Sequence, residues 1–159
     1  MKKLTLKSLP LLVFVVVLAS CAQKSPSGED THLGDLQHNF SISDEAGEHF
    51  DQGLLLLHSF EYDDANEAFQ KAIEADPDEL MAHWGLAMTH YRALWGLQDV
   101  EAGRKVIQAV GETKEARMSK AENQLEAAFW EGVEILYGEG ELDERNQRYA
   151  DHMADVYAA

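Results

Sequence analysis

Cysteine and basic residues are scarce in this chain of 159 residues, whose length suits one folded domain of moderate size. Cys21 is the only cysteine, which excludes a framework of internal disulfides. Lysine and arginine total 13 against 29 acidic residues, and without the three lysines of residues 1–20 the net charge falls from −16 to −19. Such a surface repels nucleic acid and lacks a basic patch for anionic lipids. We therefore expect no nucleic-acid partner and no membrane attachment by charge.

A hydrophobic run long enough to cross a bilayer is also missing from the start of the chain. The apolar stretch Leu11–Ala19 is shorter than the roughly 20 residues that a transmembrane helix needs. It follows the basic residues Lys2, Lys3 and Lys7 and precedes small residues, an arrangement typical of a secretory signal. The sequence therefore predicts a signal peptide over residues 1–20.

The tetrad Leu18-Ala19-Ser20-Cys21 resembles the lipobox of bacterial lipoproteins. The resemblance implies that the Cys21 sulfur takes a diacylglycerol and that the chain is cut just before it. It also implies the outer membrane of a two-membrane bacterium, because retention in the inner membrane goes mainly with Asp at the position of Ala22. Several acyl chains anchor a protein stably. The alternative is an ordinary signal peptide that ends near a cysteine.

After the cysteine comes a stretch rich in Ser, Gly, Asp and other polar residues, with few large apolar ones. This composition predicts that residues 21–42 carry the lipidated cysteine and a flexible tether. The resemblance thus implies a domain anchored in the cell envelope that faces either the periplasm or the cell exterior.

Beyond the tether, apolar residues recur at helical spacing through most of the chain. Glycine or proline interrupts the pattern near residues 77, 96, 111 and 139. We therefore expect an all-α domain over residues 43–159, with Ser43 and Asp78 as natural helix N-caps. The expected helices cover residues 44–59, 61–75, 79–94, 99–110, 117–137 and 141–158.

One part of this domain carries an ordered set of glycine, aromatic, alanine and proline residues. The set consists of Gly53, Tyr62, Ala65, Phe69, Ala72 and Pro77. Gly53 and Ala65 would let two helices approach closely, and Phe69 would fill the space between helix pairs. The spacing resembles the tetratricopeptide repeat (TPR), whose period is 34 residues. The resemblance implies antiparallel helix pairs that stack as an α-solenoid.

The resemblance weakens along the chain. It implies a first repeat at residues 46–79 and a degenerate second repeat at residues 80–114, where the second half of the motif recurs only with three extra residues. Residues 115–159 are expected to form a further helix pair without the motif. Similar bacterial repeat proteins continue for many more helices, and the chain ends without a capping signal. We therefore expect this sequence to be the N-terminal part of a longer protein.

Motifs of catalysis are missing as well. The sequence contains no nucleophile elbow, phosphate loop, dinucleotide fingerprint or EF-hand spacing, so we predict neither enzymatic activity nor a cofactor. One alternative stays open, because the repeat register places His49, His83 and His90 at related positions. A metal-handling or enzymatic envelope protein could use them, although the spacings typical of metal ligands do not occur. Histidine rings at such positions more often pack in place of aromatic residues.

The function that the resemblance implies is the binding of a protein or peptide partner by an envelope-anchored scaffold. In TPR stacks the first helix of each pair lines the concave face. The side chains that the register places there are Phe50, Leu54, Leu57, Trp84, Met88 and Tyr91. All are apolar or aromatic, and soluble proteins rarely expose such a surface. Either another part of the chain, such as the tether, covers this face, or it holds an apolar helix or extended peptide of a partner.

Overall fold

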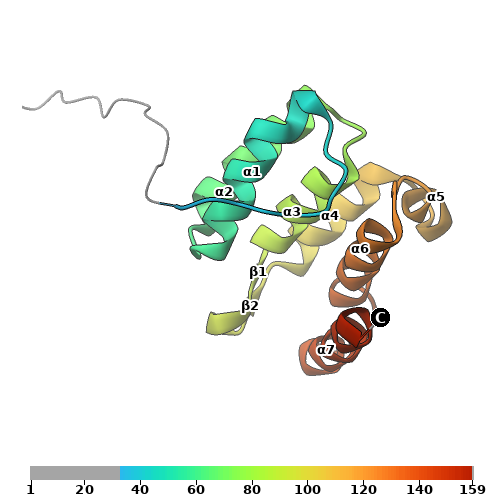
Figure 1. Ribbon diagram of the computed structural model, residues 1–159. Helices are drawn as coiled ribbons and strands as arrows, with labels where there is room; N and C mark the ends of the chain where they lie inside the picture. The colour runs from blue at the N-terminus through green and yellow to red at the C-terminus, as the bar shows by residue number, and fades with distance from the viewer. Residues whose placement is uncertain (1–32, 159) are drawn as a thin grey trace, which may run out of the picture. The chain divides into compact units, whose positions relative to one another are not determined.

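The computed structural model describes residues 33–158, which form a mostly helical domain (Figure 1). The predicted signal peptide 1–20, Cys21 and the first part of the predicted tether lie outside the described residues. The helices are α1 (Asp44–His58), α2 (Tyr62–Ala75), α3 (Leu80–Thr89), α4 (Val100–Val110), α5 (Lys114–Met118), α6 (Gln124–Leu136) and α7 (Leu142–Ala158). Between α3 and α4 the strands β1 (Tyr91–Arg92) and β2 (Leu97–Gln98) pair antiparallel around the short 3₁₀ turn η1 (Ala93–Trp95).

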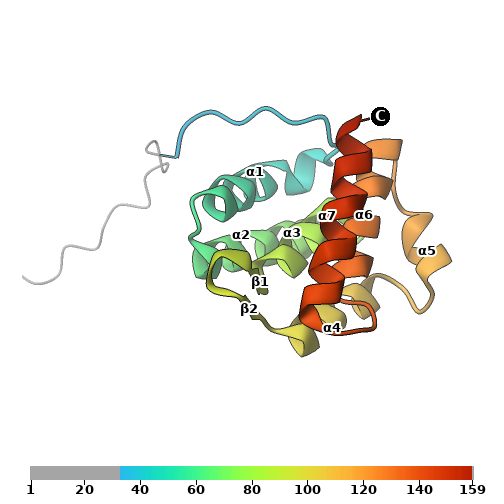
Figure 2. The same cartoon turned by 90° about the horizontal axis from the view of Figure 1, so that it is seen from below.

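Neighbouring helices pack as pairs, so the helical architecture predicted from the sequence is confirmed at this level. Helix α1 packs along α2, α3 along α4, and α6 along α7. Helix α3 also contacts α1, α2 and α6, which places it at the centre of the domain (Figures 1 and 2). No helix within residues 33–158 is both long enough and apolar enough to span a bilayer.

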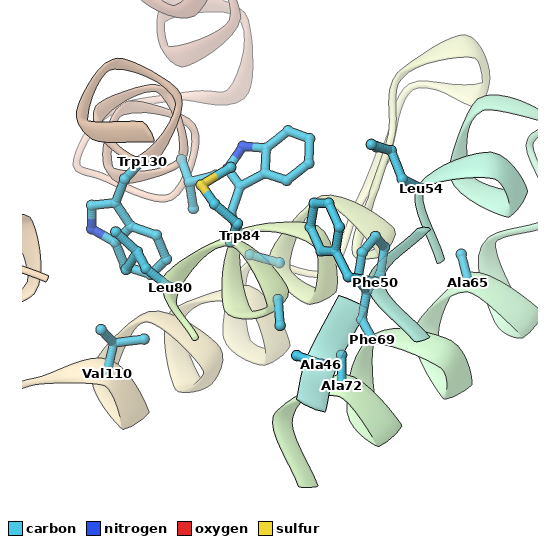
Figure 3. Packing of buried hydrophobic residues seen from close by; sticks show 14 of the residues in the cluster. Ala46, Phe50, Leu54, Ala65, Phe69, Ala72, Leu80, Trp84, Val110 and Trp130 are labelled. Atoms are coloured by element: carbon cyan, nitrogen blue, oxygen red, sulfur yellow. The ribbon is translucent and has the colours of Figure 1, made fainter. Parts of the chain in front are cut away.

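The ring of Phe69 lies between α1 and α3 and holds the first helix pair to the next one. It is fully buried and stands 5.8 Å from the ring of Phe50, as Figure 3 illustrates. A Cβ atom built on Gly53 would come within 2.9 Å of the Phe69 ring, and one built on Gly85 within 2.2 Å. Both glycines therefore make room for the ring. This is the close approach that the sequence led us to expect at Gly53, whereas the role of Gly85 was not foreseen.

The helix predicted over residues 79–94 is confirmed up to Thr89 and is wrong beyond it. Helix α3 ends at Thr89, whose hydroxyl donates to the carbonyl of Leu86 at 2.7 Å. The chain then forms the β1–β2 hairpin, in which Gly96 adopts a left-handed conformation with φ of 62°. As a result Trp95 lies in the turn of the hairpin and is 57% exposed.

The helix predicted over residues 117–137 is in fact two helices, α5 and α6. The helix is interrupted at Asn123, which is the N-cap of α6: its side-chain oxygen accepts the N–H of Glu126 at 3.0 Å. The Glu126 carboxylate in turn accepts the N–H of Glu122 at 2.8 Å. This reciprocal arrangement resembles a capping box.

Ser43 stands at the N-cap position of α1, as predicted, whereas Asp78 is not the N-cap of α3. The Ser43 side chain makes no capping hydrogen bond to α1. Glu79, not Asp78, caps α3, since its carboxylate accepts the N–H of Met81 at 3.1 Å. Asp78 makes other contacts instead: the Asp76 carboxylate accepts its N–H in a side-chain turn, and the Asp78 carboxylate pairs with Lys120 at 2.7 Å.

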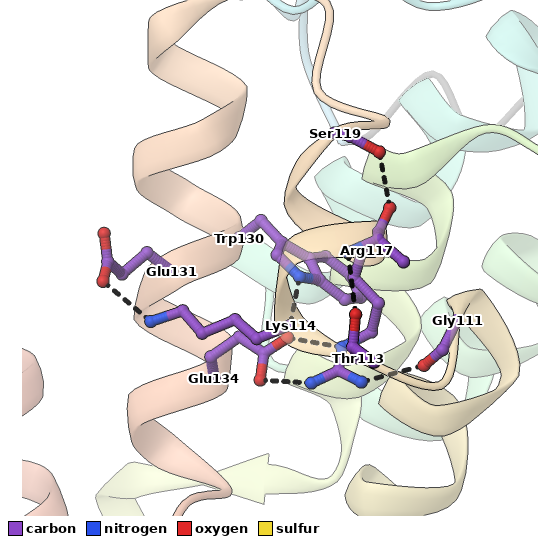
Figure 4. A network of polar contacts seen from close by, with 9 residues as sticks. Gly111, Thr113, Lys114, Arg117, Ser119, Trp130, Glu131 and Glu134 are labelled. Carbon is purple, nitrogen blue, oxygen red and sulfur yellow. Dashed lines mark hydrogen bonds and ion pairs between the residues drawn. The ribbon is translucent and has the colours of Figure 1, made fainter.

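A nearly buried ion pair fastens α5 to α6 (Figure 4). The Arg117 guanidinium donates to both carboxylate oxygens of Glu134, at 2.6 and 2.9 Å, and to the carbonyl of Gly111 at 2.8 Å. The indole N–H of Trp130 donates to the same carboxylate at 3.1 Å. Because both charges find hydrogen-bond partners, the pair can be tolerated in a poorly hydrated place.

Candidate functional site

Residues 33–42, which the sequence analysis assigned to the tether, lie against the helices. This stretch, here called the N-terminal segment, crosses the domain in blue before the chain enters α1 (Figure 1). Its large apolar side chains pack against the core and are Leu33, Leu36, Phe40 and Ile42. The side of α1, α3 and α6 that the segment covers is called the inner face below.

Phe40 is the aromatic anchor of the N-terminal segment. Its ring centroid lies 6.1 Å from that of Phe50 on α1, 6.0 Å from that of Trp84 on α3 and 5.2 Å from that of Phe129 on α6. The contacts with Phe50 and Phe129 are edge-on, the arrangement that aromatic quadrupoles favour. One side chain of the segment thereby joins three helices of the inner face.

Two buried carboxylates hold the backbone of the chain where it passes from the segment into α1. The N–H of Ser41 donates to Oε1 of Glu126 at 2.6 Å, and the N–H of Ser43 donates to Oε2 of Glu79 at 3.0 Å. Glu126 is 2% exposed and Glu79 is 8% exposed. Burial raises the pKa of Glu79, and the N–H donors Ser43 and Met81 act against that rise. Main-chain donors thus satisfy the carboxylates without requiring a particular side chain.

His38 fixes the middle of the segment. Its Nδ1 accepts the N–H of Phe40 at 3.2 Å, so its Nε2 carries the proton that is donated to Asp51 at 3.0 Å. The imidazole also stacks on the Phe40 ring with a centroid distance of 5.4 Å. From α1, Asp51 therefore holds His38 by a hydrogen bond, and Phe50 holds it by an edge-on ring contact at 5.4 Å.

The side chains predicted to line a concave face are distributed as follows. Phe50, Leu54 and Trp84 are buried. The rings of Phe50 and Trp84 each contact the ring of Phe40. Leu57 and Met88 are half-buried and pack against the core. Tyr91 is not on a helix as predicted but in β1, where its hydroxyl donates to Asn146 of α7 at 2.9 Å. Of the two explanations for this apolar surface, the structure supports a cover formed by part of the predicted tether.

Sequence reasoning missed Phe40, Glu79 and Glu126. A signal for Phe40 was present, since four large apolar residues lie within the otherwise polar stretch 33–42. The spacing Asn123-x-x-Glu126 is that of a capping box and could have revealed the start of α6. Nothing in the sequence alone indicated that Glu79 would accept a backbone N–H from a residue 36 positions away.

The histidines considered for the alternative function make local contacts. Burial lowers the pKa of His83, and Nε2 of its ring donates to the Pro77 carbonyl at 3.0 Å. Burial likewise lowers the pKa of His90. Within residues 33–158, no group of three or more His, Cys, Asp or Glu side chains is placed to hold a metal ion. Comparisons of the chain with protein-family models, with curated proteins and with solved structures found no match.

Proposed function

We propose that this protein is an envelope-anchored lipoprotein with TPR-like helix pairs, and that its inner face binds an extended segment of a partner protein. The observation that carries the proposal is how the chain's own N-terminal segment engages this face. An aromatic side chain, the half-buried Phe40, packs among rings of three helices, and carboxylates accept the backbone N–H groups of Ser41 and Ser43. The segment stands in for the partner's chain, and it lies on the first helices of successive pairs, where the TPR resemblance places a binding surface.

The contacts define the chemistry of the ligand. The ring pocket selects an aromatic side chain, as at Phe40. The carboxylates of Glu126 and Glu79 require free N–H groups one and three residues later, as at Ser41 and Ser43. Proline has no N–H and would be rejected at either position. The expected ligand is therefore an extended peptide with an aromatic residue and no proline at the first or third following position.

The segment competes with any such ligand, because it is covalently joined to α1. An external peptide binds only in proportion to the fraction of molecules whose segment is displaced, so its apparent affinity for the wild-type chain is reduced by that fraction. Weakening the segment should expose the site. We therefore choose Phe40→Ala as the receptor, since this change removes the ring that fills the aromatic pocket.

The experiment measures binding of a fluorescent peptide with the sequence of residues 36–44 by anisotropy. We expect saturable binding to the Phe40→Ala chain and weaker binding to the wild type. Adding Glu126→Gln to the Phe40→Ala chain should weaken binding, because a neutral amide oxygen accepts the N–H less strongly than the carboxylate does. A matched peptide with proline at the position of Ser41 serves as the control. Equal binding of the two peptides, or no binding of either one, would reject the proposal for the inner face.

The anchor is tested separately. Metabolic labelling with a fatty acid is expected to mark the wild-type protein and to leave the Cys21→Ala variant unlabelled, with an uncut precursor. Label retained by Cys21→Ala would show that acylation occurs elsewhere.

A further inference from the structure

Large hydrophobic side chains gather at one exposed place on the domain. Within residues 33–158 the exposed ones are Phe60, Leu94, Trp95, Leu97 and Tyr157. The first four belong to the α1–α2 turn and the β1–β2 hairpin, which meet through ring contacts: the Trp95 centroid lies 6.2 Å from Phe60 and 5.8 Å from Tyr62. These four and Tyr62 are called the aromatic tip.

The backbone at Phe60 is unfavourable for any residue except glycine. Phe60 has φ of 63° and follows the last turn of α1, where its N–H donates to Leu57 and the N–H of Glu61 donates to Leu56. This is the Schellman ending of a helix, whose left-handed position usually carries glycine. The Phe60 ring is 52% exposed, so burial does little to compensate the strain. A strained residue that holds a hydrophobic ring in solvent indicates a role outside the fold.

The aromatic tip lies on the side of the domain where the described chain begins. The blue start of the described chain, the α1–α2 turn and the hairpin are all on the left in Figures 1 and 2, whereas the end of α7 is on the right. Residues 22–32 separate Leu33 from Cys21, and a chain of this length spans about 40 Å at most. A lipid on Cys21 would therefore hold the start of the described chain, which lies on this side of the domain, within about 40 Å of the bilayer.

We propose that the aromatic tip rests in the interfacial layer of the bilayer in which Cys21 is anchored. This inference depends on the lipid anchor of the proposed function. Tryptophan and tyrosine favour this layer because one part of the ring is apolar and the other keeps a polar group in water. Leucine adds apolar surface that enters the layer with them.

The charges around the tip predict which lipids it accepts. Arg92 lies over the Tyr62 ring at 5.3 Å and pairs with Asp63 at 2.6 Å. Glu61 and Asp64 are exposed beside them. The local charge is thus negative, so the contact gains nothing from anionic lipids. We expect a shallow, apolar contact with zwitterionic lipid that salt does not weaken.

The test couples residues 21–159 through the single thiol of Cys21 to a maleimide phospholipid in phosphatidylcholine vesicles. Half of the preparations contain brominated acyl chains, which quench nearby indoles. Trp84 and Trp130 are buried at 6% and 0% exposure, so Trp95 is the indole within reach of lipid. We expect brominated lipid to quench part of the emission of the wild-type chain, and Trp95→Phe to abolish the lipid-dependent part. Equal emission in brominated and ordinary vesicles would overturn the proposal and leave the tip to a protein partner.

Two further variants separate membrane contact from a purely structural role. In the Trp95→Phe background, Tyr157→Trp moves an exposed indole to the end of α7, where we expect no quenching; Tyr157 is 95% exposed. Phe60→Gly keeps the fold, because glycine suits the left-handed backbone, yet it should lower the quenching of Trp95. Strong quenching of the indole at position 157 would show that the domain lies on the membrane in another orientation. Because the thiol coupling replaces cellular acylation, failure of the anchor and failure of the tip are told apart.

Discussion

Replacing Phe40 by alanine would remove the ring that joins the N-terminal segment to α1, α3 and α6. A phenylalanine side chain buries 150 Å² or more when fully enclosed, and this one is half-buried. Taking roughly 100 Å² of lost apolar burial at about 25 cal/mol per Å² gives about 2.5 kcal/mol. The edge-on contacts with Phe50 and Phe129 add to this figure, so we expect a cost of about 3 kcal/mol.

Two measurements locate the loss. Urea unfolding reports the global free energy, and amide hydrogen exchange reports whether the segment opens by itself. If the ring holds the segment, exchange at the N–H groups of Ser41 and Ser43 should accelerate about 100-fold, which corresponds to somewhat under 3 kcal/mol. Exchange in α2 should change only as far as the global stability changes.

Leu94→Ala is the matched control, because Leu94 is also a large apolar residue but is 69% exposed. We expect its free energy of unfolding to stay within about 0.5 kcal/mol of the wild type. The reasoning about Phe40 fails if Phe40→Ala behaves like this control, or if the amides of Ser41 and Ser43 stay as protected as before.

Three further predictions concern the helices. Gly85→Ala should destabilise the domain by about 1–3 kcal/mol in urea, because its Cβ would stand 2.2 Å from the Phe69 ring. Gly47 in α1 has open space around it, so Gly47→Ala should instead stabilise the helix by about 0.5–1 kcal/mol. Arg117→Met should cost about 3 kcal/mol, because it leaves the nearly buried Glu134 carboxylate without its cation and with the Trp130 N–H as its remaining donor; a loss below about 1 kcal/mol would contradict this. Burial lowers the pKa of His83 in the folded state. As the pH falls below about 6.5, the unfolded chain takes up this proton before the folded chain does, so the stability should fall. His83→Gln should reduce this loss in thermal melts across about pH 5–7.

The helical part of the fold was readable from the sequence because its signals are local. Apolar spacing gave the extents of α1, α2, α4 and α7 to within a few residues. The order of Gly53 and Phe69 gave the close packing between helices, since a small residue opposite a large ring is visible in one chain. Pro77 marked the turn between α2 and α3 for the same reason.

The remaining features depend on contacts between distant residues. Helix α3 gives way to the hairpin at Thr89 although apolar residues continue to Trp95, so spacing alone could not show the end. The break before α6 was hidden because Met118, Ala121 and Leu125 continue one apolar stripe across it.

The covered inner face was the hardest feature to predict, because it joins three separate parts of the chain. Phe40 meets Phe129, and Ser41 meets Glu126 at a separation of 85 residues. A polar stretch with scattered apolar residues predicts a flexible tether unless the side chains that accept its backbone N–H groups are known. Both acceptors also lie at the start of a helix, Glu79 at α3 and Glu126 at α6. A carboxylate is common there for local reasons, so nothing points to a distant partner.

The path of the N-terminal segment also determines how the domain responds to tension. Force transmitted through the residues before Leu33 enters at the end of the segment farthest from the hydrogen bonds of Ser41 and Ser43. The contacts are then loaded one after another, as in peeling, rather than all together, as in shear. We expect the segment to detach at low force while α1 and α2 remain paired, so that a pull from the N-terminal side uncovers Phe50 and Trp84 without unfolding the helices.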